Sequence, residues 1–240
     1  MMARKQIRWL TLLGFTGIAV FTACMIGLHM FQPELSPMDE AMSYYVHGRH
    51  GWLTSVGLAA LGIGSLAIML SVAQMAHGPG SRLGMAFLFL WSLGAILGGI
   101  FSADPRGNWD QPPSMSGAIH GVAALIALSS FPVACAALTR NLRRDNRWHW
   151  HSSLLGNLAI LVIASFIVFM ASLTPVFIRP GPPILLGLTE RVLFVSFVAW
   201  LTVVALGLFR ISRVPNERRR RPNRHDVTGT LHEHRPIRPA

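Results

Sequence analysis

Residues 101–121 read FSADPRGNWDQPPSMSGAIHG and lie between two strongly apolar runs. This stretch carries Asp104, Arg106 and Asp110, and His120 follows one turn into the next apolar run. A polar group within a bilayer costs free energy unless it has a partner. Asp104 and His120 are therefore the residues whose presence most needs an explanation.

Apolar runs of this kind recur along the whole chain, and short charged islands separate them. The composition is 52% hydrophobic and 13% charged, whereas a soluble protein has roughly 25% charged residues. Only helices and closed barrels satisfy every backbone amide within lipid, and runs of about 20 apolar residues favour helices. The sequence therefore predicts an all-α, polytopic membrane protein built as a six-transmembrane-helix bundle.

The polar islands set the expected limits of each part of the chain. We expect an N-terminus at residues 1–8, a transmembrane domain at 9–210 and a basic, disordered tail at 211–240. The expected spans cover about 9–31, 52–76, 83–103, 116–138, 153–178 and 188–209. The first apolar run continues past Cys24 to spanning length, which favours a membrane helix over a cleaved signal peptide.

Positive charge is distributed unequally between the two sides of the expected bundle. One side holds the basic N-terminus, Arg82, the arginines of 140–147 and the tail, whereas the other holds mainly acids. The positive-inside rule then places both termini in the cytoplasm. We read the net charge of +11 as topology information and expect no nucleic-acid partner. The tail arginines should attract anionic lipid headgroups of the bilayer at roughly 1 kcal/mol each; they are Arg218, Arg219, Arg220 and Arg221.

Polar residues at the outer helix ends form the candidate site. Asp104, His120 and Ser43 are the candidate catalytic residues, and the candidate ligand-binding residues are Tyr44, Tyr45, Glu190 and Arg191. These side chains could converge on one outward-facing pocket. An Asp–His pair can serve as a base, a metal site or a proton relay. The alternative is that Asp104 accepts a hydrogen bond from His120 and only ties two helices together.

Three functions remain open at this stage. The first is an integral membrane protein whose outward pocket binds a lipid, an isoprenoid or another small amphiphile. The second is an intramembrane hydrolase that uses Asp104, His120 and Ser43, by analogy with seven-span ceramidase-like enzymes. Its optional zinc would be held by His47, His50, His120 and Asp104. The third, a proton-coupled transporter, is disfavoured by the lack of charges near the midplane. The sequence implies no particular cofactor, and it contains no Walker motif or CxxC pair.

Two short elements resemble a known family. Phe101-Ser102-Ala103-Asp104-Pro105 is similar to a Phe-Pro-x-Asp element, and Gly117-Ala118-Ile119-His120 is similar to a Gly-x-x-His element, of the bacterial and archaeal six-span proteins grouped as domain of unknown function family 998. Ser102 stands where that family usually has proline. The resemblance covers about residues 9–210 and implies a six-span protein of a bacterial or archaeal cytoplasmic membrane. It implies no activity.

Overall fold

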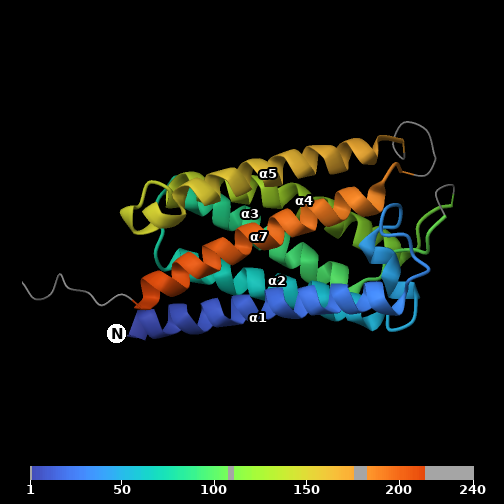
Figure 1. Cartoon of the computed structure of the whole chain (residues 1–240), viewed down its shortest axis with the longest axis horizontal. Helices are drawn as coiled ribbons and strands as arrows, with labels where there is room; N and C mark the ends of the chain where they lie inside the picture. Colours follow the sequence, from blue (N-terminus) through green and yellow to red (C-terminus); the bar gives the residue numbers. More distant parts are fainter. Residues whose placement is uncertain (1, 108–110, 176–182, 214–240) are drawn as a thin grey trace, which may run out of the picture.

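The computed structural model describes residues 2–107, 111–175 and 183–213, and these residues form helices without any strand (Figure 1). The elements are α1 Met2–Phe31, η1 Met42–His47, α2 Trp52–Ala73, α3 Pro79–Ile100, α4 Met115–Leu142, η2 Asn146–His151, α5 Ser152–Ser172 and α7 Leu186–Arg213. Six of the helices are long and apolar enough to cross a membrane. The prediction of an all-α membrane protein with six spanning helices is confirmed.

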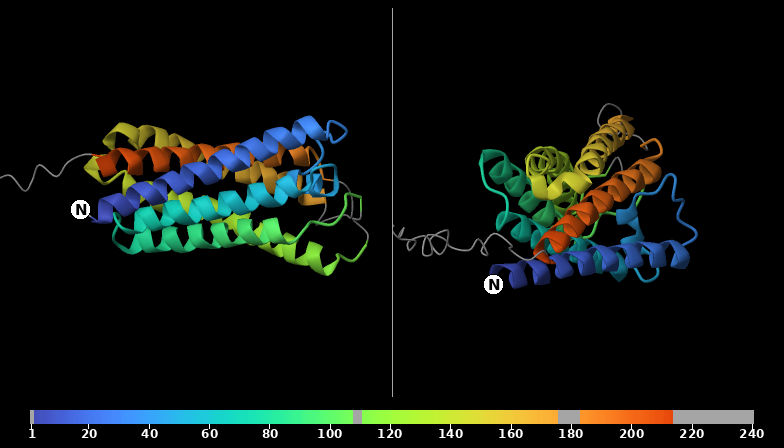
Figure 2. Two further views of the ribbon diagram at one scale, coloured as in Figure 1. Left: turned by 90° about the horizontal axis from the view of Figure 1, so that it is seen from below. Right: turned by 60° about the vertical axis from the view of Figure 1, so that its left-hand side comes forward.

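The long helices form one bundle in which most chain neighbours also pack together. Helix α1 packs along α2, α2 along α3, and α3 along α4, while α7 lies between α1 and α5 (Figures 1 and 2). The last helix therefore returns to the first, and side chains from both ends of the sequence meet in the middle of the bundle.

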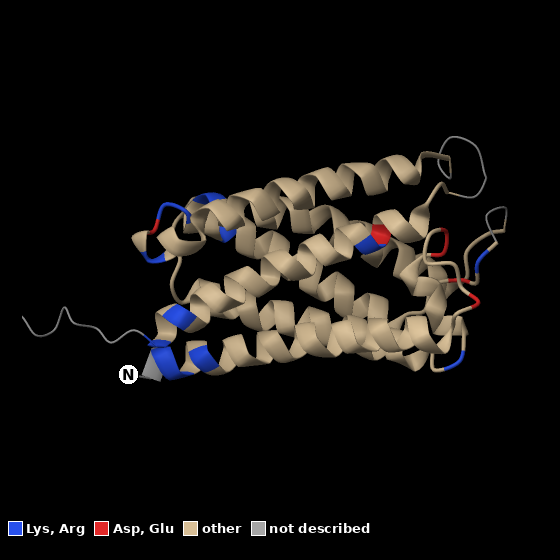
Figure 3. Cartoon of the chain, viewed as in Figure 1, with Lys and Arg blue, Asp and Glu red and all other residues tan. Residues whose placement is uncertain are grey.

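Charged residues separate toward the two ends of the bundle (Figure 3). The "basic end" is the end that holds Arg4, Arg82, Arg140, Arg147 and Arg210, and the "acidic end" is the end that holds Glu34, Asp39, Glu40 and Asp104. Arg106 pairs with Glu40 at the acidic end and Asp145 pairs with Arg147 at the basic end. Glu190 and Arg191 lie in the second turn of α7, where Glu190 is buried.

Four helices extend clearly past the predicted spans at the basic end. Helix α1 begins at Met2, α3 begins at Pro79, α4 ends at Leu142 and α7 ends at Arg213. Hydropathy marks only the part of a helix inside hydrocarbon, whereas backbone hydrogen bonding continues into the interface, where arginine side chains reach water. Residues 214–240, which include most of the predicted disordered tail and Arg218–Arg221, lie outside the described residues.

Small residues allow the helices to approach closely. A β-carbon placed on Gly64 of α2 would stand only 3.0 Å from the Cα of Gly17 on α1. A β-carbon on Gly94 of α3 would stand 2.7 Å from the carbonyl oxygen of Ala123 on α4. Such contacts between backbones favour helix association in lipid, where no hydrophobic effect drives the helices together.

Aromatic side chains fill the centre of the bundle. Phe131 and Phe197 stack with their ring centroids 4.0 Å apart, and Trp91 meets Phe131 edge to face. The indole of Trp91 donates a hydrogen bond to the Ser65 hydroxyl at 3.0 Å, so its only polar group is satisfied in the apolar interior. The candidate site lies between this aromatic cluster and the acidic end.

Candidate functional site

The segment between α1 and α2 folds across the start of α7. The backbone N–H of Met42 donates a hydrogen bond of 2.6 Å to the carboxylate of Glu190, and both residues are buried. A β-carbon on Gly187 would stand 2.6 Å from the carbonyl oxygen of Glu40, so only glycine permits this approach. Residues 32–51 are therefore held against the last helix of the bundle.

Arg191 makes most of the remaining bonds between α7 and this segment. Its guanidinium donates to His29 Nε2 at 2.8 Å, to the Glu40 carbonyl at 2.9 Å and to the Tyr45 hydroxyl at 3.0 Å. It also lies over the Tyr45 ring, 5.6 Å from the centroid. We call these bonds from Glu190 and Arg191 to residues 32–51 the clamp. Tyr45 and Arg191 were predicted to bind a ligand, but the structure places them in the clamp and outside the two pockets described next.

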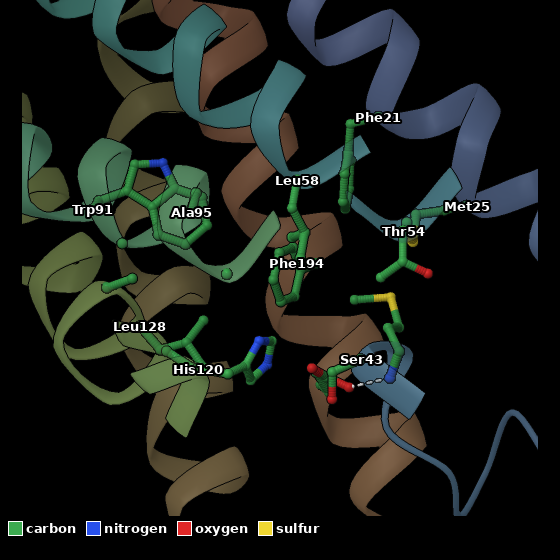
Figure 4. Close-up of a pocket in the computed structure, with 16 residues that line it drawn as sticks. Phe21, Met25, Ser43, Thr54, Leu58, Trp91, Ala95, His120, Leu128 and Phe194 are labelled. Atoms are coloured by element: carbon green, nitrogen blue, oxygen red, sulfur yellow. Dashed lines mark hydrogen bonds between the residues drawn. The ribbon is translucent and has the colours of Figure 1, made fainter. Parts of the chain in front are cut away.

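A small cavity with a mainly apolar lining lies beneath the segment, between α1, α2, α3, α4 and α7 (Figure 4). Its volume is about 50 Å³. The apolar wall includes Phe21, Met25, Leu58, Trp91, Leu128 and Phe194. Polar groups come from Ser43, Thr54, His120 and Glu190. In Figure 4 the His120 ring and Ser43 lie beside the hydrogen bond between Met42 and Glu190.

A larger and more polar pocket lies at the surface of the acidic end. Its volume is about 480 Å³, and its lining includes Tyr44, Asp104, Gln111 and Ser114. Ser43 and His120 line this outer pocket as well as the apolar cavity. No lysine or arginine belongs to its lining among the residues that the structure describes. The two spaces therefore meet at Ser43 and His120, and the outer one carries no described positive charge apart from any on His120.

Asp104 lies beside Ser114, the N-cap residue of α4, and makes no hydrogen bond to His120 within the described structure. Its carboxylate accepts a hydrogen bond of 3.0 Å from the backbone N–H of Ser114, and it lies against Gly117, whose missing side chain leaves room for it. Ser114 Oγ accepts from the Gly117 N–H at 3.0 Å. A carboxylate at a helix N-terminus is stabilised by the unpaired amides and the helix dipole.

His120 is oriented by a backbone carbonyl instead of by Asp104. Its Nδ1 lies 2.8 Å from the carbonyl oxygen of Phe101. Because a carbonyl can only accept, Nδ1 carries the hydrogen, and in the neutral ring Nε2 keeps its lone pair. Both Asp104 and His120 line the outer pocket, so the structure brings them to one site without pairing them.

Tyr44 contributes a neutral phenol to the outer pocket. Burial raises the pKa of Tyr44 to about 12, and the nearby charges of Glu190 and Glu40 add to that effect. The hydroxyl therefore stays protonated at ordinary pH and can both donate and accept a hydrogen bond.

The four residues considered for zinc are not gathered into one site. His47 Nε2 lies 2.7 Å from the Ala103 carbonyl oxygen, and the His50 ring packs on Phe31 with centroids 4.8 Å apart. Within the described ranges, no three His, Cys, Asp or Glu side chains lie close enough together to hold a metal ion.

Several residues of the site carry no sequence signal that would have identified them. Thr54 is 3% exposed, lines the apolar cavity and leaves its hydroxyl without a hydrogen-bond partner among the described residues. A buried unsatisfied hydroxyl requires an explanation, and a water or ligand hydroxyl in the cavity would provide one. Gly94-x-x-x-Gly98 has the spacing typical of close helix packing, but a β-carbon on Gly98 would have its nearest neighbours, His120 and Leu58, at 3.8 Å.

Comparison with known proteins gives one match. A family model described as "Protein of unknown function (DUF998)" matches residues 15–207, which is more than half of the chain. Neither the curated proteins nor the solved structures contain a match.

Proposed function

The chain belongs to the DUF998 family of membrane proteins, and we propose that it binds a lipid or another small amphiphile at its acidic end. The family description assigns no activity, so the proposal depends on the geometry of the site. Following the charge distribution, the proposal places the acidic end outside the cell and both termini in the cytoplasm.

The observation that supports this function is the junction of a polar pocket with an apolar cavity. The outer pocket of about 480 Å³ and the inner cavity of about 50 Å³ share Ser43 and His120. An amphiphile has the same division, because its head forms hydrogen bonds and its chain avoids water. The cavity accommodates only a short apolar group, but Met25 and Met42 line it, and unbranched methionine side chains can repack around a ligand.

The outer pocket favours a head that is neutral and carries hydroxyl groups. Its described lining offers the Tyr44 phenol, the Ser43 hydroxyl and His120, together with the carboxylate of Asp104. Arginine and lysine, which usually bind phosphate and carboxylate, are absent from the described lining. A phosphate would therefore face Asp104 without a compensating charge.

The test compares three oleoyl compounds that differ only in the head. Native mass spectrometry of delipidated, detergent-solubilised protein should detect bound 1-oleoylglycerol more readily than oleate or oleoyl lysophosphatidic acid. Gly98→Leu should fill the cavity without a backbone collision and weaken binding about tenfold, because excluding two methylenes costs roughly 0.8 kcal/mol each. Gly80→Leu is the matched control, since Gly80 lies at the other end of α3 with only Asn141 within 4 Å. Unchanged binding in Gly98→Leu would contradict the proposal.

Hydrolysis is the second candidate, because Ser43 and His120 lie together at the junction of the two spaces. Because the His120 Nδ1 faces the Phe101 carbonyl, Nε2 is the ring nitrogen that could accept a proton, and this carbonyl takes the orienting position where Asp104 had been expected. Release of glycerol and oleate from 1-oleoylglycerol in the same samples, abolished in Ser43→Ala, would favour the enzyme. Intact ligand in every sample would favour simple binding.

A further inference from the structure

A groove lies at the basic end, between the last turns of α4 and the first turns of α5. Its volume is about 470 Å³. Its described lining includes three arginines, namely Arg140, Arg143 and Arg144. It lies at the opposite end of the bundle from the amphiphile site.

These three arginines have no acidic partner in the described structure. The ion pairs there are Arg106 with Glu40 and Arg147 with Asp145. Hydrogen bonds from Arg147 lower the pKa of the Asp145 carboxyl, which keeps that pair charged. Arg143, by contrast, makes only a long hydrogen bond of 3.4 Å to the Ser152 hydroxyl. The groove is therefore a concentration of uncompensated positive charge.

The start of α5 adds to the attraction for an anion. Ser152 and Gly156 line the groove from the first two turns of this helix, and no side chain caps its N-terminus. Because a helix N-terminus carries partial positive charge, it acts in the same direction as the arginines.

The deeper part of the groove is apolar and opens onto the outside of the bundle. Ala136 of α4 and Ala159 and Ile160 of α5 line it, and Ile160 is 68% exposed. The groove is charged at the helix ends and apolar one to two turns further along the helices. A phospholipid has the same order, with a charged headgroup followed by apolar acyl chains.

We propose that the groove between α4 and α5 binds an anionic phospholipid, with its phosphate at Arg140, Arg143 and Ser152 and an acyl chain along Ala136 and Ile160. This site differs from the amphiphile site in position, and in the charge of the headgroup that it selects. A free phosphate would use the arginines but would leave the apolar part of the groove without a role.

Native mass spectrometry of delipidated protein with dioleoylphosphatidylglycerol and dioleoylphosphatidylcholine tests the proposal. Each arginine near a membrane surface strengthens binding of an anionic headgroup about fivefold. Arg140→Gln with Arg143→Gln should therefore bind phosphatidylglycerol about 25-fold more weakly and should bind phosphatidylcholine unchanged. The matched control, Arg82→Gln with Arg213→Gln, removes the same charge from exposed positions at the same end but outside the groove, and should bind like the wild type.

A second variant tests the groove without changing charge. A β-carbon on Gly156 would stand 3.0 Å from the Arg143 guanidinium, so Gly156→Leu should fill the groove and also lose phosphatidylglycerol. The proposal is overturned if either groove variant binds phosphatidylglycerol like the wild type, or if the control loses as much. It is also overturned if inorganic phosphate at the lipid's concentration displaces the lipid, because the site would then recognise phosphate alone.

Discussion

His120 and Asp104 both lie at the predicted site, but neither has the hydrogen-bond partner that the sequence suggested. Each lines the outer pocket, but His120 faces the Phe101 carbonyl and Asp104 accepts from the Ser114 N–H. Both partners are backbone groups, which a sequence does not distinguish from position to position. The sequence could therefore identify the two side chains as significant, but it could not show what each of them bonds.

Removing the carboxylate of Asp104 should destabilise the protein, because the Ser114 N–H would lose its acceptor and the start of α4 would lose a nearby negative charge. We expect Asp104→Ala to lower the free energy of unfolding by about 1 kcal/mol, with a smaller loss for Asp104→Asn, whose amide oxygen still accepts a hydrogen bond. Unfolding in mixed micelles titrated with sodium dodecyl sulfate measures the change.

Glu34→Ala provides the control for Asp104, since Glu34 is exposed at the same end. It should change stability by less than about 0.5 kcal/mol. Equal losses in the two variants would show that the bond between Ser114 and Asp104 contributes nothing specific.

At the scale of the elements, Gly94 and Gly98 of α3 differ in how closely they approach the neighbouring helix. They lie one turn apart, and Gly-x-x-x-Gly spacing is typical of close helix contact at both positions. Both glycines line the cavity, but only Gly94 is in close contact with α4, at Ala123 and Ala127, whereas the nearest neighbours of a β-carbon on Gly98 are the His120 and Leu58 side chains at 3.8 Å. Spacing along one helix cannot show which neighbour each residue meets, because that depends on how the partner helix is rotated.

The two glycines should therefore respond differently to the same substitution. Gly94→Ala places a β-carbon 2.6 Å from that of Ala127, so α3 and α4 must move apart, and we expect a loss of about 1–3 kcal/mol. Gly98→Ala makes only ordinary contacts at 3.8 Å and should be neutral within about 0.5 kcal/mol.

Unfolding in mixed micelles again measures both variants. A larger loss in Gly98→Ala than in Gly94→Ala would show that the helices approach each other at a different place.

At the scale of the whole molecule, six apolar runs were sufficient to predict six helices, because lipid leaves the backbone few other choices. The way in which α7 returns to α1 was not predictable, since each helix is apolar on most of its surface and the sequence shows no distinct contact face. The fold was consequently easier to predict than the site, whose residues come from α1, α2, α3, α4 and α7.

The orientation of the bundle can be tested with single cysteines. Cys24 and Cys135 are buried and should react little with a membrane-impermeant maleimide. On intact cells, Glu34→Cys at the acidic end should be labelled and Arg82→Cys at the basic end should not, because the uneven distribution of arginines predicts cytoplasmic termini. If only Arg82→Cys were labelled, the bundle would have the opposite orientation and the amphiphile site would face the cytoplasm.

The clamp of Glu190 and Arg191 on residues 32–51 has a consequence for biosynthesis. Met42 and Tyr45 leave the ribosome early, whereas their α7 partners arrive with the last span. Until that span is inserted, the Met42 N–H and the Tyr45 hydroxyl lack their α7 partners, and the nascent chain has no finished cavity. Assembly of the binding site would then be the final event of membrane insertion, and a chain truncated before α7 would keep the first five spans but would have no place for a ligand.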